Sequence, residues 1–188
     1  MDFAQVFTLV TGLVYIFLEI KQSNWMWVVG VLTGAAAIVV FVRGGLYASA
    51  CLNAYYVAMS IWGLHAWRRD SRAMGSEGIH LKRLTPGVAA LSAVLMAVLT
   101  WGAVRLLSIL GDPMSTLDAS VAVLSAIATW WLSRSYAEQW LLWIVADGMS
   151  AALCISQSLP WMTALYVFYT LSAVYGFVHW HRKGGYVS

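Results

Sequence analysis

Seven long runs of apolar residues, separated by shorter polar stretches, set the pattern of the chain. A helix needs about 20 mostly apolar residues to cross the hydrocarbon core of a bilayer. The fifth run is short and the fourth carries Arg105 near its end, so their limits are the least sharply defined. The pattern predicts seven membrane-spanning helices, at Phe3–Ile20, Asn24–Val42, Leu46–Trp67, Gly87–Leu110, Ala119–Ser133, Gln139–Leu159 and Trp161–Trp180.

The composition supports this interpretation. Of the 188 residues 61% are hydrophobic and 10% are charged, and the mean hydropathy is +0.75, whereas a soluble domain has about 25% charged residues. We therefore expect an all-α integral membrane protein. The opening Met1-Asp2 lacks the basic segment of a signal peptide, so we expect the first span to be retained.

The basic residues indicate an orientation. With seven spans, 9 of the 11 Lys and Arg residues fall on one side of the membrane, and only Arg43 and Arg105 lie toward the other. The positive-inside rule then places the N-terminus outside and the C-terminus in the cytoplasm. The net charge of +3 follows from this topology and requires no nucleic-acid partner. The nine are Lys21, Arg68, Arg69, Arg72, Lys82, Arg83, Arg134, Arg182 and Lys183.

An internal repeat is visible at an offset of 113 residues. Residues 60–69 (SIWGLHAWRR) align with residues 173–182 (AVYGFVHWHR), and the same offset pairs Trp27 with Trp140 and sets Gly34 opposite Asp147. Two three-helix units joined by one span point the same way, which is the parallel-repeat plan with a substrate site between the halves. We expect a first repeat at 1–67, a cytoplasmic loop and linker helix at 68–115, and a second repeat with the C-terminal tail at 116–188.

The sixth run contains one acidic residue and two tryptophans on one helical face. Trp140, Trp143 and Asp147 fall at i, i+3 and i+7. A charge within a membrane span is costly and normally faces the bundle interior. Two indoles beside a carboxylate suit a planar, cationic heteroaromatic molecule. The alternative is a structural acid bonded to a neighbouring helix, with the tryptophans in a lipid-facing belt.

Other spans offer polar side chains that could complete a pocket. We include Ser60 and Thr129 as candidates, although an isolated Ser or Thr more often bonds between membrane helices. The remaining candidates form two pairs in the repeat, Asn53 with Tyr166 and Tyr56 with Tyr169.

Several classes of activity lack their sequence signatures. There is no G-x-x-x-x-G-K-[ST] for nucleotide hydrolysis, and neither H-E-x-x-H nor G-x-S-x-G is present. The seventh run contains no lysine that could form a retinal Schiff base. Cys51 and Cys154 lie in apolar spans without a C-x-x-C, so we expect no disulfide, metal site or cofactor. We do not expect an enzyme.

The chain resembles the PnuC family of bacterial vitamin transporters over nearly its whole length. The resemblance implies a fold like a full-length sugar transporter of the SWEET type. It also implies facilitated diffusion of nicotinamide riboside, thiamine or riboflavin across the bacterial inner membrane, with trapping by a cytoplasmic kinase; PnuC-like proteins can also pack as homotrimers. The stretches that carry it are Leu46–Ser49 with Asn53, Ile61–Trp67, Leu117–Ser120 with Leu124-Ser125, and Tyr136–Ile144.

Two departures favour the thiamine branch of that family. Nicotinamide riboside members carry Ile-Asn-Val where this chain has Val145-Ala146-Asp147, and the first-half counterpart, typically Leu-Ile-Asn-Val, reads Val31-Leu32-Thr33-Gly34. An acid in place of an amide favours a substrate with donors or positive charge, and thiamine has an aminopyrimidine and a thiazolium. Three alternatives stay open: nicotinamide riboside as substrate, proton-coupled transport through Asp147, and a scaffold that transports nothing.

Overall fold

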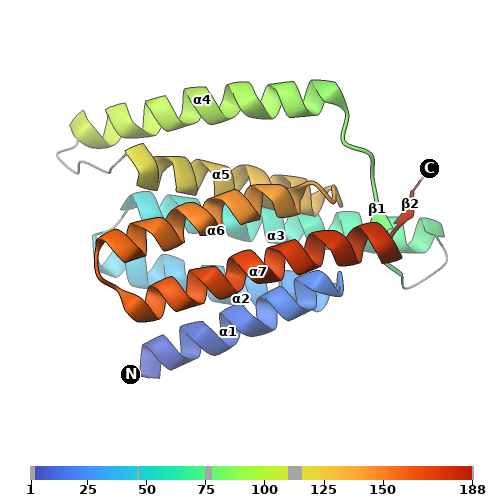
Figure 1. The fold of residues 1–188 in the computed structure, drawn as a ribbon, viewed down its shortest axis with the longest axis horizontal. Helices are drawn as coiled ribbons and strands as arrows, with labels where there is room; N and C mark the ends of the chain where they lie inside the picture. The colour runs from blue at the N-terminus through green and yellow to red at the C-terminus, as the bar shows by residue number, and fades with distance from the viewer. Residues whose placement is uncertain (1–2, 46, 75–77, 110–115, 188) are drawn as a thin grey trace. The chain divides into compact units, whose positions relative to one another are not determined.

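The computed structural model describes residues 3–45, 47–74, 78–109 and 116–187, and within them it contains seven α-helices and two short strands (Figure 1). In chain order these are α1 (Phe3–Ile20), α2 (Trp25–Arg43), α3 (Tyr47–Met74), β1 (His80–Leu81), α4 (Pro86–Ile109), α5 (Thr116–Ser133), α6 (Gln139–Ser156), α7 (Pro160–Lys183) and β2 (Gly185–Tyr186).

The apolar pattern located the helices well. Five of them, α2, α4, α5, α6 and α7, are long and apolar enough to cross a membrane. In α1 the apolar helix found is the shorter Val10–Ile20, and within the described residues α3 is not among the candidate spans. That these two also cross the membrane stays a prediction. Of the predicted limits, Leu46 and Leu110 lie outside the described residues.

Proline and glycine define several helix ends. Pro86 and Pro160 occupy the first positions of α4 and α7, where the N–H that proline lacks would have no helical acceptor. Gly45, just after α2, has a φ of 73°, a left-handed conformation that favours glycine. The expectation of a loop from Arg68 was wrong, because α3 continues through Met74. A polar helix extending beyond an apolar run leaves no hydropathy signal.

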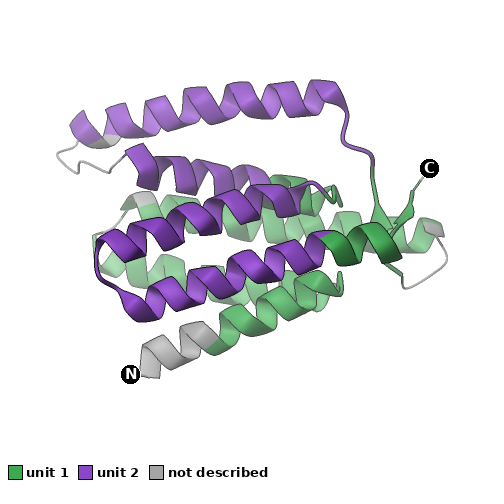
Figure 2. Ribbon diagram, in the orientation of Figure 1, with its two compact units in different colours: residues 1–82, 129–137, 178–188 green, residues 83–128, 138–177 purple. Residues whose placement is uncertain are grey.

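The residues group into two compact units, and each is described by itself (Figure 2). Unit 1 comprises residues 1–82, 129–137 and 178–188, and unit 2 comprises residues 83–128 and 138–177. The ends of α5 and α7 therefore belong to unit 1, and the larger parts of these two helices belong to unit 2.

In unit 1, helix α2 packs along α3 and contacts α1. Small residues bring the α2 and α3 backbones close together. A Cβ placed on Gly34 would lie 2.7 Å from Val57 Cγ2, and one on Gly30 would lie 2.7 Å from Ser60 Oγ. Close backbone approach at small residues is the usual way in which membrane helices pack.

Four helix ends meet in unit 1 around buried tryptophans, and we call this the helix-end cluster. The Trp67 indole of α3 donates a hydrogen bond to the Leu132 carbonyl of α5 at 3.1 Å. The Trp180 indole of α7 donates one to the Ile20 carbonyl of α1 at 3.0 Å. The two indoles contact each other with ring centroids 6.2 Å apart. Both tryptophans are fully buried, so the cluster ties α1, α3, α5 and α7 together.

Two short strands lie beside this cluster. Strand β1 comes from the loop between α3 and α4, and β2 comes from the C-terminal tail. Strands β1 and β2 pair in parallel, with His80 opposite Gly185 and Leu81 opposite Tyr186. The Gly185 N–H donates to the Ile79 carbonyl and the Val187 N–H to the Leu81 carbonyl, both at 2.8 Å. Strands of two residues carry no alternation pattern, which is why the sequence did not predict them.

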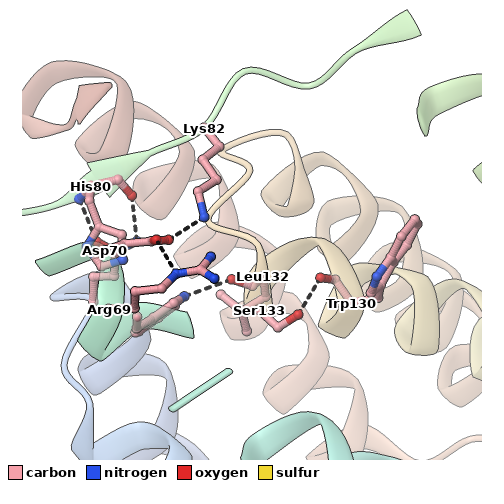
Figure 3. Close-up of polar contacts among 9 residues, drawn as sticks. Arg69, Asp70, His80, Lys82, Trp130, Leu132 and Ser133 are labelled. Atoms are coloured by element: carbon pink, nitrogen blue, oxygen red, sulfur yellow. Dashed lines mark hydrogen bonds and ion pairs between the residues drawn. The ribbon is translucent and has the colours of Figure 1, made fainter. Parts of the chain in front are cut away.

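Side chains anchor β1 to the neighbouring helix ends (Figure 3). The Gln22 amide donates to the His80 carbonyl at 2.9 Å and its oxygen accepts from the His80 N–H at 2.7 Å. Asp70 of α3 is 5% exposed and forms an ion pair with Lys82. Burial lowers the pKa of the His80 imidazole, although the Asp70 carboxylate opposes this effect.

Candidate functional site

In each half of the chain, a buried tryptophan on one helix lies against a glycine on the next helix. The two tryptophans are 113 residues apart in the sequence, and so are the two glycines. In unit 1 a Cβ on Gly63 would lie 2.5 Å from Trp27 Cζ2. In unit 2 a Cβ on Gly176 would lie 2.6 Å from Trp140 Cζ2. Both indoles are buried, Trp27 fully and Trp140 to within 1%. The contact thus occurs twice, between α2 and α3 and between α6 and α7.

The register of each helix pair follows from this contact. In antiparallel helices, seven residues forward on one helix lie opposite seven residues back on the other. Moving from Trp140 and Gly176 in this way places Asp147 opposite Tyr169. In the first pair the matched residue is Gly34, which lies against Val57 of α3, where a Cβ on the glycine would be 2.7 Å from Val57 Cγ2. The two halves therefore differ at matched positions, since an acid replaces a glycine.

A second matched position differs in the same direction. By the same register Trp143 lies opposite Ala173, whereas Gly30 lies opposite Ser60 in the first half. Neither Gly30 nor Gly34 has room for a Cβ. At these two places the first half has glycines packed against α3, whereas the second half has an indole and a carboxylate. Trp143 and Asp147 of α6 therefore have no counterpart on α2.

Around Asp147 the structure brings together three of the predicted residues. The half-buried Asp147 of α6 lies within electrostatic range of Tyr166 and Tyr169 of α7. The two tyrosine rings are in an edge-to-face arrangement, with centroids 6.1 Å apart. A carboxylate beside aromatic rings and two hydroxyl groups can meet a cationic ring that also carries hydrogen-bond donors.

Trp143, one turn before Asp147 on α6, is half-buried. Its indole nitrogen is buried and has no hydrogen-bonding partner among the described residues. Buried donors are usually satisfied. This N–H belongs to the same helical face as the carboxylate.

The remaining candidates lie in unit 1, where Ser60 and Asn53 bond within their own helix. The Ser60 hydroxyl donates to the Tyr56 carbonyl at 2.8 Å, and the Asn53 amide donates to the Ser49 carbonyl at 2.9 Å. Ser60 is also buried against Gly30. Tyr56 is half-buried, and Thr129, near the end of α5, is buried. Unit 1 thus holds Asn53, Tyr56, Ser60 and Thr129, and unit 2 holds Trp140, Trp143, Asp147, Tyr166 and Tyr169.

Two shallow grooves occur in unit 2 and neither is lined by a predicted site residue. One lies at the turn between α6 and α7, near Leu159 and Pro160. The other lies between α4 and the start of α5, near Trp101 and Ser120. Within the described residues, no group of three His, Cys, Asp or Glu side chains could hold a metal ion.

Sequence reasoning missed Gly176, Gly63, His80 and Gln22. The two glycines stand at matching places in the aligned repeat stretches, which was a visible signal for a shared structural role. His80 and Gln22 gave no such signal, because their contacts join segments 58 residues apart.

Comparison with known proteins gives a consistent picture. The family model "Nicotinamide mononucleotide transporter" matches residues 2–182. The chain is 27% identical to the nicotinamide riboside transporter PnuC of Escherichia coli K12, over 85% of this chain and 76% of that protein. It is 29% identical to the PnuC of Neisseria mucosa, over 86% of this chain and 65% of that protein.

Two further similarities extend this comparison. The chain is 26% identical to the riboflavin/roseoflavin transporter RibM of Streptomyces davaonensis, over 91% of this chain and 81% of that protein. The crystal structure of the vitamin B3 transporter PnuC superposes with a TM-score of 0.69 at 24% identity, covering 93% of this chain and 78% of that one. The fold is therefore the PnuC transporter fold.

Proposed function

Because the chain belongs to the nicotinamide mononucleotide transporter family, which includes the PnuC proteins, we propose that it carries a water-soluble vitamin with a flat, cationic ring across the membrane. The observation that carries this proposal is the group formed by Asp147, Tyr166 and Tyr169. The vitamin's ring packs against the Trp143 indole, and its positive charge faces the Asp147 carboxylate.

Nicotinamide riboside is the first candidate substrate. Two of the relatives named above are nicotinamide riboside transporters. Its pyridinium supplies the positive charge, and its carboxamide supplies donors that Asp147 can accept. The comparisons therefore favour nicotinamide riboside over the thiamine expected from the sequence.

Thiamine is the second candidate, and Asp147 is the specific observation in its favour. A carboxylate accepts hydrogen bonds without donating any, and it attracts positive charge. Thiamine offers both an amino group and a thiazolium. Riboflavin, the substrate named for RibM, has a neutral ring system and gains less from a carboxylate.

The helix-end cluster supports a cytoplasmic location for one end of unit 1. Its contacts bring the ends of α1, α3, α5 and α7 together, so the exposed cations that flank these ends lie at one end of the unit. The positive-inside rule places that end in the cytoplasm. The proposed orientation in the inner membrane results from this placement. We further propose that the vitamin enters by facilitated diffusion and is then trapped by a cytoplasmic kinase. These cations are Lys21, Arg68, Arg69, Arg72, Arg134, Arg182 and Lys183.

The test is a titration of purified protein with nicotinamide riboside, thiamine and riboflavin, followed by intrinsic tryptophan fluorescence. We expect saturable quenching by one cationic vitamin. Asp147→Asn should weaken its affinity at least about tenfold, because a charge-assisted contact contributes about 1.5–3 kcal/mol.

Asp118→Asn, which neutralises an acid in the first turn of α5, is the matched control and should leave the affinity unchanged. Equal affinities of wild type and Asp147→Asn for every vitamin that binds would contradict the role of Asp147. If an imposed pH gradient drives uptake in liposomes, transport is proton-coupled instead of facilitated diffusion.

A further inference from the structure

The packing of Trp140 does not suit direct contact with a substrate. Its side chain is 1% exposed. The six-membered ring of its indole faces the backbone of α7 at Gly176, where a Cβ would lie within 2.6–2.7 Å of the ring atoms Cζ2, Cε2 and Cη2. A vitamin could stack on this indole only if α6 and α7 separated. Trp143, one turn further along α6, is half-buried.

The first half repeats this packing without the chemistry. Trp27 is fully buried, and its Cζ2, Cε2 and Cη2 atoms lie 2.5–2.7 Å from the Cβ position of Gly63. Yet the residue seven positions after Trp27 is Gly34, which has neither charge nor side chain. A contact that is kept where the acid is absent serves the helix pair and not the ligand.

We propose that Trp140 is a positioning residue and that Gly176 is the site against which it packs. Their contact sets the spacing and register of α6 on α7, and thereby presents Asp147 to Tyr169 two turns away. The effect on vitamin binding rests on the proposed function, whereas the packing of Trp140 against Gly176 does not depend on it. It separates Trp140 from Trp143, which the sequence alone had treated as equivalent candidates.

A methyl group at Gly176 tests this directly. Ordinary contacts of a Cβ lie at 3.4–4 Å, so the added atom would overlap the indole. The clash involves the α7 backbone and a buried ring, and a surface side chain cannot relieve it by rotating. Gly176→Ala should therefore displace α6 from α7. We expect a lower melting temperature and an affinity for the bound vitamin weakened about tenfold.

The decisive variant restores the space by reducing the indole. Trp140→Phe combined with Gly176→Ala should recover most of the melting temperature and most of the affinity lost in Gly176→Ala. The matched controls use the other half: Gly63→Ala should be rescued by Trp27→Phe and not by Trp140→Phe. Melting temperature by fluorescence or scattering and affinity by titration are measured on the same detergent-purified samples.

Partner-specific rescue of both quantities supports the positioning role. The proposal is overturned if Trp140→Phe alone abolishes binding at an unchanged melting temperature, because Trp140 would then contact the vitamin. It is also overturned if Gly176→Ala changes neither quantity. If the wild type binds none of the three vitamins, the proposed function fails, while rescue of the melting temperature still decides the packing.

Discussion

His80 is a buried imidazole in a helix-end cluster whose exposed neighbours are basic. Its ring contacts Trp67 edge-to-face with centroids 5.8 Å apart, and its backbone is held on both sides by Gln22. The charged groups that act on it are Asp70, which favours the imidazolium, and Lys82, which disfavours it. Burial is the largest effect, so the pKa of His80 in the folded protein lies below its ordinary value of 6.5.

A dependence of stability on pH follows from this lowered pKa. Below about pH 6.5 the unfolded chain binds a proton at His80 more readily than the folded chain does, so the free energy of unfolding falls as the pH falls. Above this value the contribution is fully present. We expect the melting temperature to drop between pH 6.5 and 5, and His80→Gln to reduce the slope.

The exposed His181 supplies the comparison variant, His181→Gln, which removes an exposed imidazole instead of the buried one. An unchanged slope in His80→Gln would show that another group is responsible.

The placement of a side chain was predictable from the sequence only where it depends on a single helix. The shared face of Trp143 and Asp147 needs only the helical period. Whether Trp140 is exposed or buried depends on what α7 places opposite it, and a glycine there is a property of another segment. Ser60 shows the same limit, because its hydroxyl bonds within α3 and its side chain is covered by Gly30.

At the scale of elements, the apolar runs located the helices and missed the polar segments at their ends. The predicted spans at Phe3–Ile20 and Gln139–Leu159 correspond to α1 and, within three residues, to α6. The polar extension of α3 to Met74 and the strand pair β1–β2 were not predictable from hydropathy. Their stability comes from contacts between distant segments, such as Lys82 N–H to the Ser135 carbonyl at 3.1 Å.

The contribution of the β1–β2 strand pair to stability can be tested by substitution at Gly185. Gly185→Pro removes the N–H that donates to the Ile79 carbonyl, whereas Gly185→Ala keeps it. Losing a buried hydrogen bond costs about 1–3 kcal/mol, and 1 kcal/mol shifts the melting temperature by about 2–4 °C in a chain of this size. We expect the proline variant to melt several degrees below the alanine variant.

If both variants melt at the wild-type temperature, β2 does not stabilise the helix-end cluster. A matched loss in both would point to the glycine backbone itself and not to the hydrogen bond.

At the scale of the whole molecule, two similar helix pairs differ where the function is proposed. Each pair has the same tryptophan–glycine contact, so the offset of 113 residues relates packing as well as sequence. The division at 1–67, 68–115 and 116–188 remains a prediction, as does a site formed jointly by both halves.

Uptake by purified protein in liposomes tests directly whether the chain carries a cationic vitamin across a membrane. Radiolabelled nicotinamide riboside and thiamine are compared, without a pH gradient and with unlabelled vitamin inside to drive exchange. We expect saturable uptake of at least one of them, strongly reduced by Asp147→Asn and unaffected by Asp118→Asn. Uptake no faster than in protein-free liposomes for both vitamins would contradict this expectation.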